Sequence, residues 1–253
     1  MPSTKDINPD PRKLLFVGSN GRGKTLAWAS VTKILPPGAK VYCFDFDGRM
    51  APIKMRYPDV DIEFDTYGHK NFLQFRNKVL ALADAPRYQA VILDSVTSCS
   101  ISAINYQLDI KGAKAKMVSN LPVTSWDEIN GETILFSQAL DVLKMYPGIV
   151  VVTAHPVDKT TIVEGQPPIK TKELIAYGPK VGSLIPNYFN EIYSFYKESN
   201  IDPKLGSKYF IRTNDDIAKT SFNLPGQIDW TGQDFFPILH ELLKGKGVNL
   251  LQS

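Results

Sequence analysis

The chain has 253 residues, with 29 Lys and Arg against 26 Asp and Glu, so its formal net charge at pH 7 is +3. Hydrophobic residues make up 43% of the chain and charged residues 22%, which is typical of a globular protein and excludes a collagen-like or broadly disordered chain. A net charge this small does not by itself indicate a nucleic-acid partner. The sequence shows no apolar leader and no run of about 18 apolar residues. We therefore expect a cytoplasmic protein that does not enter a membrane.

Strands and helices are predicted to alternate through the first 154 residues. Residues 1–12 are polar and contain three prolines, which predicts a flexible arm ahead of a single domain over residues 13–253. Residues 13–17 form a short apolar run, as in a buried strand of a parallel sheet, and a helix is predicted over 24–35. Further strands are predicted over 41–46, 62–64, 88–93 and 148–154, further helices over 71–83, after Ser95 to about 108 and over 126–146, and a mobile loop over 109–124.

The pattern changes after residue 154. Residues 160–163 and 169–174 flank a turn sequence and predict a hairpin. Short alternating strands are predicted over 191–196, 208–213 and 218–224, followed by a helix over 235–243. The predicted fold is therefore α/β, with a mostly parallel central sheet, helices on both of its faces and an antiparallel C-terminal extension.

Residues 18–25, with the sequence GSNGRGKT, match the pattern GxxxxGK[ST] in full. A predicted buried strand precedes the motif and a predicted helix follows it, as a phosphate-binding loop (P-loop) requires. Backbone N–H groups of such a loop face the phosphates of ATP, and its lysine reaches the β- and γ-phosphates. We predict that ATP binds to Gly18, Ser19, Asn20, Gly21, Arg22, Gly23, Lys24 and Thr25. The alternative is a glycine-rich turn without a ligand.

Two oxygen-bearing side chains are candidates for holding Mg²⁺ beside the phosphates. The P-loop hydroxyl, here Thr25, is a magnesium ligand in ATPases of this kind. Asp94 ends a predicted strand, which is where the second magnesium carboxylate is expected. A helix N-cap is the alternative role for Asp94.

Three further side chains lie at the ends of predicted strands and are candidates for the chemistry. Asp45 and Asp47 end the second strand, whose carboxyl end faces the nucleotide crevice in such folds. We predict that Asp47 orients the water that attacks the γ-phosphate, with Asp45 or a solvated Asp-Gly turn as alternatives. His155 follows the strand over 148–154 and is predicted to sense the γ-phosphate; a structural histidine is the alternative.

Five segments occur in an order that resembles RecA-type ATPases: GSNGRGKT, VYCFDFDG, YQAVILDSVTS, SWDEINGETILFSQALDVL and VVVTAHPVDK. More narrowly, they resemble short phage-encoded proteins that keep only the RecA core, some of which act in single-strand annealing or recombination. The resemblance covers about residues 13–222. It implies a RecA-like ATPase domain with an inserted strand between the P-loop strand and the Asp94 strand, and a ring or filament of identical subunits.

The resemblance also assigns roles to single residues. It places the catalytic carboxylate at Asp47, although RecA itself has a longer Glu, and the sensor at His155, where RecA has Gln. Residues 218–221 resemble a family segment with Lys followed by Arg, but Ser221 replaces the Arg. A neighbouring subunit is then expected to supply the missing cation, and Lys219 is the candidate; an exposed strand lysine is the alternative.

Two segments correspond to the DNA-binding loops of RecA-type proteins, at about 109–123 and 156–180. Lysines there are predicted to contact the phosphates of single-stranded DNA. They are Lys111, Lys114, Lys116, Lys159, Lys170 and Lys172. The alternative is that both segments are solvated loops, since acidic residues are interspersed and aromatic residues are few.

The sequence is compatible with three functions. The first is an ATPase that acts on single-stranded DNA in phage recombination, annealing or repair, with a single-strand-binding protein as a possible partner. The second is a nucleotide-gated assembly or loading factor for phage replication or packaging. The third, a small-molecule kinase, fits less well because no segment concentrates the arginines of a kinase lid.

Overall fold

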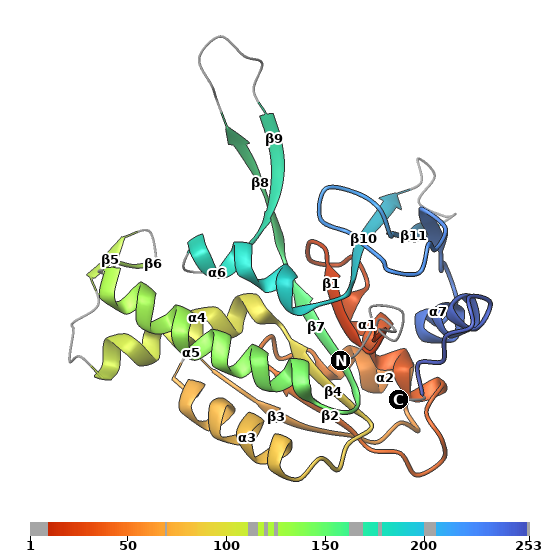
Figure 1. Cartoon of the computed structure of the whole chain (residues 1–253), viewed down its shortest axis with the longest axis horizontal. Coiled ribbons are helices and arrows are strands. Elements are labelled where there is room, and N and C mark those ends of the chain that lie inside the picture. Colours follow the sequence, from red (N-terminus) through yellow and green to blue (C-terminus); the bar gives the residue numbers. More distant parts are fainter. Residues whose placement is uncertain are drawn as a thin grey trace, which may run out of the picture.

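A computed structural model describes residues 10–68, 70–110, 116–118, 121–123, 126–161, 169–176, 179–199 and 206–251. Within these residues, one central sheet has eight strands in the order β12-β11-β10-β1-β7-β4-β2-β3 (Figure 1). The strands are β1 (Lys13–Val17), β2 (Val41–Asp45), β3 (Ile62–Thr66), β4 (Ala90–Asp94), β7 (Ile149–Ala154), β10 (Glu191–Ser199), β11 (Ser207–Arg212) and β12 (Gln227–Asp229). The predicted α/β fold is confirmed.

The strands from β10 to β3 in this order are parallel, and β11 and β12 are antiparallel additions at one edge. β10 was expected to belong to the antiparallel extension, but it pairs in parallel with β1, with Leu15 opposite Ile192. β7 lies between β1 and β4, which is the inserted strand that the resemblance implied. The carboxyl ends of β1, β7, β4 and β2 therefore meet at one edge of the sheet.

Helices cover both faces of the sheet because successive strand residues point to opposite sides. Leu14 and Phe16 pack in the cluster that includes α1 (Lys24–Ala29), α2 (Met50–Arg56) and α7 (Phe235–Lys244). Leu15 and Val17 pack in the cluster that includes α3 (Phe72–Asp84), α4 (Val96–Ile110) and α5 (Trp126–Met145). Figure 1 shows the sheet with α3, α4 and α5 on one side and α1, α2 and α7 on the other. Shorter elements are η2 (Ser30–Lys33), α6 (Pro179–Leu184) and η3 (Ile185–Tyr188).

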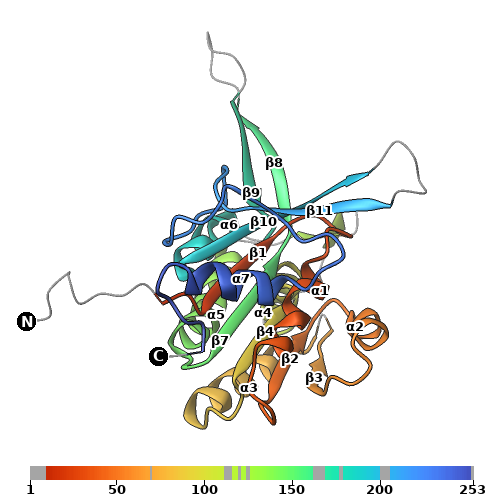
Figure 2. The same ribbon diagram turned by 90° about the vertical axis from the view of Figure 1, so that its right-hand side faces the viewer.

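A long hairpin projects from the body of the molecule (Figures 1 and 2). It consists of β8 (Pro156–Thr161) and β9 (Ile169–Leu174), which pair with each other in a separate antiparallel sheet. The prediction of a hairpin is confirmed, but β8 begins directly after His155, four residues earlier than expected. The hairpin is therefore a direct continuation of the central strand β7.

Several elements differ from the predictions. The predicted strand over 218–224 is wrong: Lys219 forms only an isolated bridge to Ile192, and the Asp215 carboxylate accepts the backbone N–H groups of Ile217 and Ala218, which folds this segment into a turn. The helix predicted over 24–35 becomes η2 after Ala29 and ends at Lys33. The predicted loop over 109–124 contains β5 (Lys116–Val118) and β6 (Leu121–Val123), an antiparallel pair.

The described end of the predicted N-terminal arm is attached to the domain. Arg12 donates from its guanidinium to the Pro147 carbonyl at 2.8 Å, and its own carbonyl accepts the Val150 N–H. Asp10 forms an ion pair with Arg12 at 2.8 Å. Residues 10–12 are thus part of the folded body, and residues 1–9 lie outside the described residues. Among the described helices, none is long and apolar enough to cross a membrane.

Candidate active site

The P-loop connects β1 to α1 at the carboxyl edge of the sheet. The Gly18 N–H donates to the Ala154 carbonyl of β7 at 3.2 Å, which fixes the start of the loop. Gly21 and Gly23 have φ angles of 71° and 93°, a left-handed conformation that favours glycine. A Cβ at Gly23 would also lie 2.6 Å from the Trp230 ring. The loop geometry therefore explains why glycine stands at these positions.

Lys24 lies buried at the start of α1. Its ammonium donates to the carbonyls of Gly18 and Ser19, the latter at 3.3 Å, and lies 3.4 Å from Nδ1 of His155. Burial lowers the pKa of Lys24 to about 8, although the carboxylates of Asp94 and Asp47 act in the opposite direction. An anion beside this ammonium would favour its charged form. Lys24 is therefore placed as a phosphate ligand requires.

The residues predicted to hold Mg²⁺ lie side by side. Thr25 Oγ1 donates to Asp94 Oδ2 at 3.0 Å, and the same carboxylate accepts the Trp28 indole N–H at 3.0 Å and the Thr153 hydroxyl. These three donors are neutral, and no described lysine or arginine forms an ion pair with the buried Asp94 carboxylate. A hydroxyl and a carboxylate beside a phosphate loop are the oxygen donors that Mg²⁺ takes in such sites. Thr25 and Asp94 thus fit this metal.

Asp45 and Asp47 have different surroundings. Asp45 is buried, accepts the Arg49 backbone N–H at 3.1 Å and holds the turn before α2. Burial raises the pKa of Asp45, although this backbone hydrogen bond acts in the opposite direction. Asp47 lines the cavity that contains Lys24, and it accepts the hydroxyls of Ser95 at 3.0 Å and Ser98 at 2.5 Å. The geometry therefore favours Asp47 over Asp45 for contact with a ligand.

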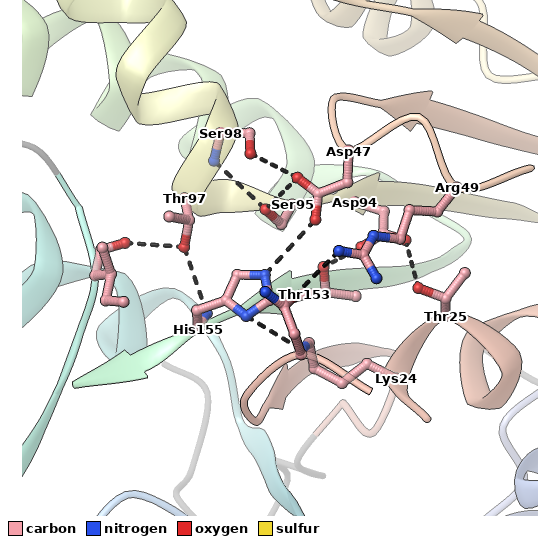
Figure 3. Close-up of polar contacts among 12 residues, drawn as sticks. Lys24, Thr25, Asp47, Arg49, Asp94, Ser95, Thr97, Ser98, Thr153 and His155 are labelled. Carbon is pink, nitrogen blue, oxygen red and sulfur yellow. Dashed lines mark hydrogen bonds and ion pairs between the residues drawn. The ribbon is translucent and has the colours of Figure 1, made fainter. Parts of the chain in front are cut away.

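His155 connects Asp47 to Lys24 (Figure 3). Its Nε2 lies 3.6 Å from Asp47 Oδ2, and its Nδ1 lies 3.4 Å from the Lys24 ammonium. A ring with its proton on Nε2 satisfies both contacts. Burial tends to raise the pKa of Asp47, but hydrogen bonds from His155, Ser98 and Ser95 outweigh it and lower that pKa to about 2. The predicted sensor and the predicted catalytic carboxylate are thus direct neighbours.

These residues line one cavity of about 420 Å³. Its lining includes the P-loop and residues at the carboxyl ends of the strands, and also aromatic and polar residues that the sequence did not single out. They include Tyr57, Tyr209, Trp230 and Gln233. The Tyr57 hydroxyl donates to Asp234 at 2.5 Å, which ties α2 to the segment before α7. No motif connects these positions, because they come from three separate parts of the chain.

Four of the six residues predicted to contact DNA lie in described strands. Lys111 and Lys114 lie outside the described residues, and Lys116 belongs to β5. Lys159, Lys170 and Lys172 belong to the hairpin β8–β9, where Lys159 pairs with Glu173 at 2.7 Å.

Lys172 lines a second cavity, of about 310 Å³, at the foot of the hairpin. Arg22, Lys197 and Arg212 line it too, together with Asp158 and Asp215. Lys219 is exposed beside Ile192 and does not line the P-loop cavity of its own chain. Its action on a neighbouring subunit stays a prediction.

Comparison with known proteins adds the family. A family model described as an AAA domain, AAA_24, matches residues 10–220, a range that contains the P-loop, Asp47, Asp94 and His155. No curated protein sequence matches the chain. Because the model covers most of the chain and the structure has the corresponding fold and loop, the chain belongs to this family of AAA-type P-loop ATPases.

Proposed function

We propose that the protein binds ATP with Mg²⁺, hydrolyses it, and couples hydrolysis to single-stranded DNA. The observation that carries the proposal is that Lys24, the Thr25–Asp94 pair and the Asp47–His155 pair all line one cavity at the P-loop. These are the parts that phosphoryl transfer to water requires: a phosphate cradle, a metal site and a group that positions water.

Each residue has a defined task in this proposal. Lys24 and the backbone of the P-loop bind the β- and γ-phosphates, and Thr25 and Asp94 hold Mg²⁺, which neutralises phosphate charge when bound. Asp47 accepts a hydrogen bond from the attacking water, and His155 donates one to the γ-phosphate after leaving its contact with Asp47. The aromatic side chains that line the cavity, Tyr57 and Trp230 among them, hold the purine base.

Coupling to DNA is supported by the connection between His155 and the hairpin. The His155 carbonyl accepts the Ile175 N–H at 2.8 Å, and the Ile175 carbonyl accepts the Thr97 hydroxyl at 3.0 Å. His155 thus lies between the phosphate site and both strands of the hairpin. A change at the γ-phosphate that moves His155 would therefore move the foot of β8–β9. The second cavity lies there and is lined by four basic residues, Arg22, Lys172, Lys197 and Arg212. Cations gathered in this way are suited to a DNA backbone.

The resemblance to RecA-core proteins also bears on the oligomeric state of the protein and on the process in which it acts. We propose a ring or filament of identical subunits on single-stranded DNA, acting in phage recombination, annealing or repair. This rests on the resemblance of the strand-end motifs to those of RecA-core proteins.

The test is ATP turnover titrated with single-stranded DNA, with duplex DNA as the comparison and oligomer size measured in parallel. We expect stimulation by the single strand, a steep loss of binding as salt rises, and loss of stimulation in His155→Ala while basal hydrolysis persists. Tight ATP binding with negligible turnover would instead support the assembly or loading factor. Transfer of phosphate to a small acceptor would support the kinase.

A further inference from the structure

The turn after β2 carries an arginine, Arg49, that has no role in the ATP hydrolysis proposed above. Arg49 follows Asp47 and Gly48, and Gly48 has a φ of 66°, the left-handed conformation that this tight turn requires. The Arg49 N–H donates to Asp45 Oδ1 at 3.1 Å, so a buried carboxylate fixes the backbone at this point. The side chain therefore leaves the turn from a defined position, two residues after Asp47.

The Arg49 guanidinium lies in the nucleotide cavity. Its Nη2 donates to the Asn20 side-chain oxygen of the P-loop at 3.2 Å, and Arg49 lines the same cavity as Lys24. Figure 3 shows Arg49, Lys24 and His155 pointing toward a shared space. The positive charge of Arg49 is one of the influences that lower the pKa of Lys24, after burial. Two cations thus face the same space and repel each other.

No described carboxylate forms an ion pair with Arg49. The two nearest in sequence have other partners: Asp45 accepts backbone N–H groups of the turn, and Asp47 accepts Ser95 and Ser98 and lies against His155. Asn20 offers Arg49 only a neutral oxygen. A half-buried guanidinium beside a buried ammonium is stabilised when an anion lies between them, and the P-loop is where a phosphate would lie.

We propose that Arg49 binds the γ-phosphate from within the same chain and stabilises its transfer to water. This rests on the proposed ATP hydrolysis. In that step the water oxygen forms a bond to the γ-phosphorus and the bond to the β–γ bridging oxygen breaks. ADP leaves, and the water proton is released with inorganic phosphate. Arg49 neutralises the charge that develops on the γ-phosphate oxygens. The chain then completes its own site, and turnover does not require Lys219 of a neighbouring subunit.

The first experiment compares Arg49→Ala, Arg49→Lys and the control Lys54→Ala, which removes an exposed lysine of α2 that does not line the cavity. We expect kcat to fall roughly 100- to 1,000-fold in Arg49→Ala, to fall less in Arg49→Lys, and to be unchanged in Lys54→Ala. Affinity for ADP, which lacks the γ-phosphate, is expected to equal that of the wild type in both Arg49 variants, which also shows that they are folded. Wild-type kcat in Arg49→Ala would overturn the proposal.

The second experiment asks whether Arg49 acts within its own subunit. Lys24→Ala and Arg49→Ala proteins are mixed and their ATP turnover is measured. Because both residues serve the same site of the same chain, no mixed assembly contains a new intact site, and we expect no gain over the separate proteins. Recovery of activity would show that Arg49 acts across a subunit interface. A wild-type protein that binds neither ATP nor ADP would instead contradict the proposed function itself.

Discussion

Asp47 is held in a way that suits orientation of water more than removal of its proton. Hydrogen bonds from His155, Ser98 and Ser95 hold the pKa of Asp47 at about 2, against the effect of burial. A carboxylate with so low a pKa is a weak base at neutral pH, far from the match between pKa and operating pH that favours proton transfer. In this account Asp47 fixes the position of the water, and the proton leaves with the phosphate product.

Replacing Asp47 tests this role. Asp47→Asn is expected to bind ATP with near wild-type affinity and to lose hydrolysis, because a neutral amide holds the water less strongly than a carboxylate. Binding and turnover measured on the same protein separate the two effects. Unchanged turnover would contradict this role for Asp47 and would make Asp45 the candidate for orienting the water.

The low pKa of Asp47 also predicts a change in stability with pH. A carboxylate whose pKa is lowered on folding stabilises the folded chain above its unfolded pKa of about 3.9, and this contribution is lost as the pH falls toward 2. Between these values, the free energy of unfolding of Asp47→Asn is expected to fall less steeply than that of the wild type. Equal slopes in urea titrations across this range would show that the hydrogen bonds to Asp47 do not stabilise its ionised form.

The C-terminal segment contributes to the P-loop cavity, although it lies beyond residue 220, where the family match ends. Trp230, directly after β12, packs against the P-loop at Gly23 and against Phe195 of β10. The Phe236 N–H donates to the Ser30 hydroxyl at 2.9 Å, which docks α7 onto η2. The segment therefore places an aromatic wall beside the phosphate cradle.

If this aromatic wall contacts the base, its loss is expected to weaken binding of the base and to leave binding of the phosphates unchanged. Trp230→Ala is expected to weaken ATP binding roughly 10- to 100-fold, because stacking on an aromatic side chain contributes about 1–3 kcal/mol per base. Affinity for inorganic tripolyphosphate, which has no base, is expected to stay unchanged. Titration calorimetry with both ligands makes the comparison, and Gln233→Ala provides a milder, exposed substitution in the same wall. Equal loss for both ligands would show that Trp230 supports the P-loop and does not contact the base.

The sequence identified elements well where one local pattern determines them. Residues 13–17 and 149–154 are buried on both faces, so their continuous apolar runs predicted the central strands. α2 was missed because it is short, carries Pro52 in its first turn and buries only Ile53. The strand predicted over 218–224 was wrong. The Asp215 carboxylate accepts the N–H groups of Ile217 and Ala218, a local turn that alternation of apolar residues does not reveal, and Lys219 then forms only an isolated bridge to Ile192.

The parallel topology of the central sheet brings the residues of the site together. Parallel β1, β2, β4 and β7 all end at one edge, so Lys24, Asp47, Asp94 and His155 meet although 131 residues separate the first from the last. The P-loop motif identified Lys24, and the ends of the predicted strands identified the other three, which is why the sequence predicted that these four lie together. Arg49 and Trp230 could not be found, because one depends on the direction of a turn and the other on the docking of α7.

Binding and hydrolysis of ATP in this cavity can be tested on the purified protein. The most direct measurement is release of inorganic phosphate from ATP and Mg²⁺, in the presence of single-stranded DNA, by the wild type, by Lys24→Ala and by the control Lys246→Ala, which removes an exposed lysine after α7. We predict turnover by the wild type and the control and a loss of roughly 100-fold or more in Lys24→Ala, because the buried ammonium that binds the phosphates is removed. Phosphate release by Lys24→Ala at the wild-type rate would show that this cavity is not where ATP is hydrolysed.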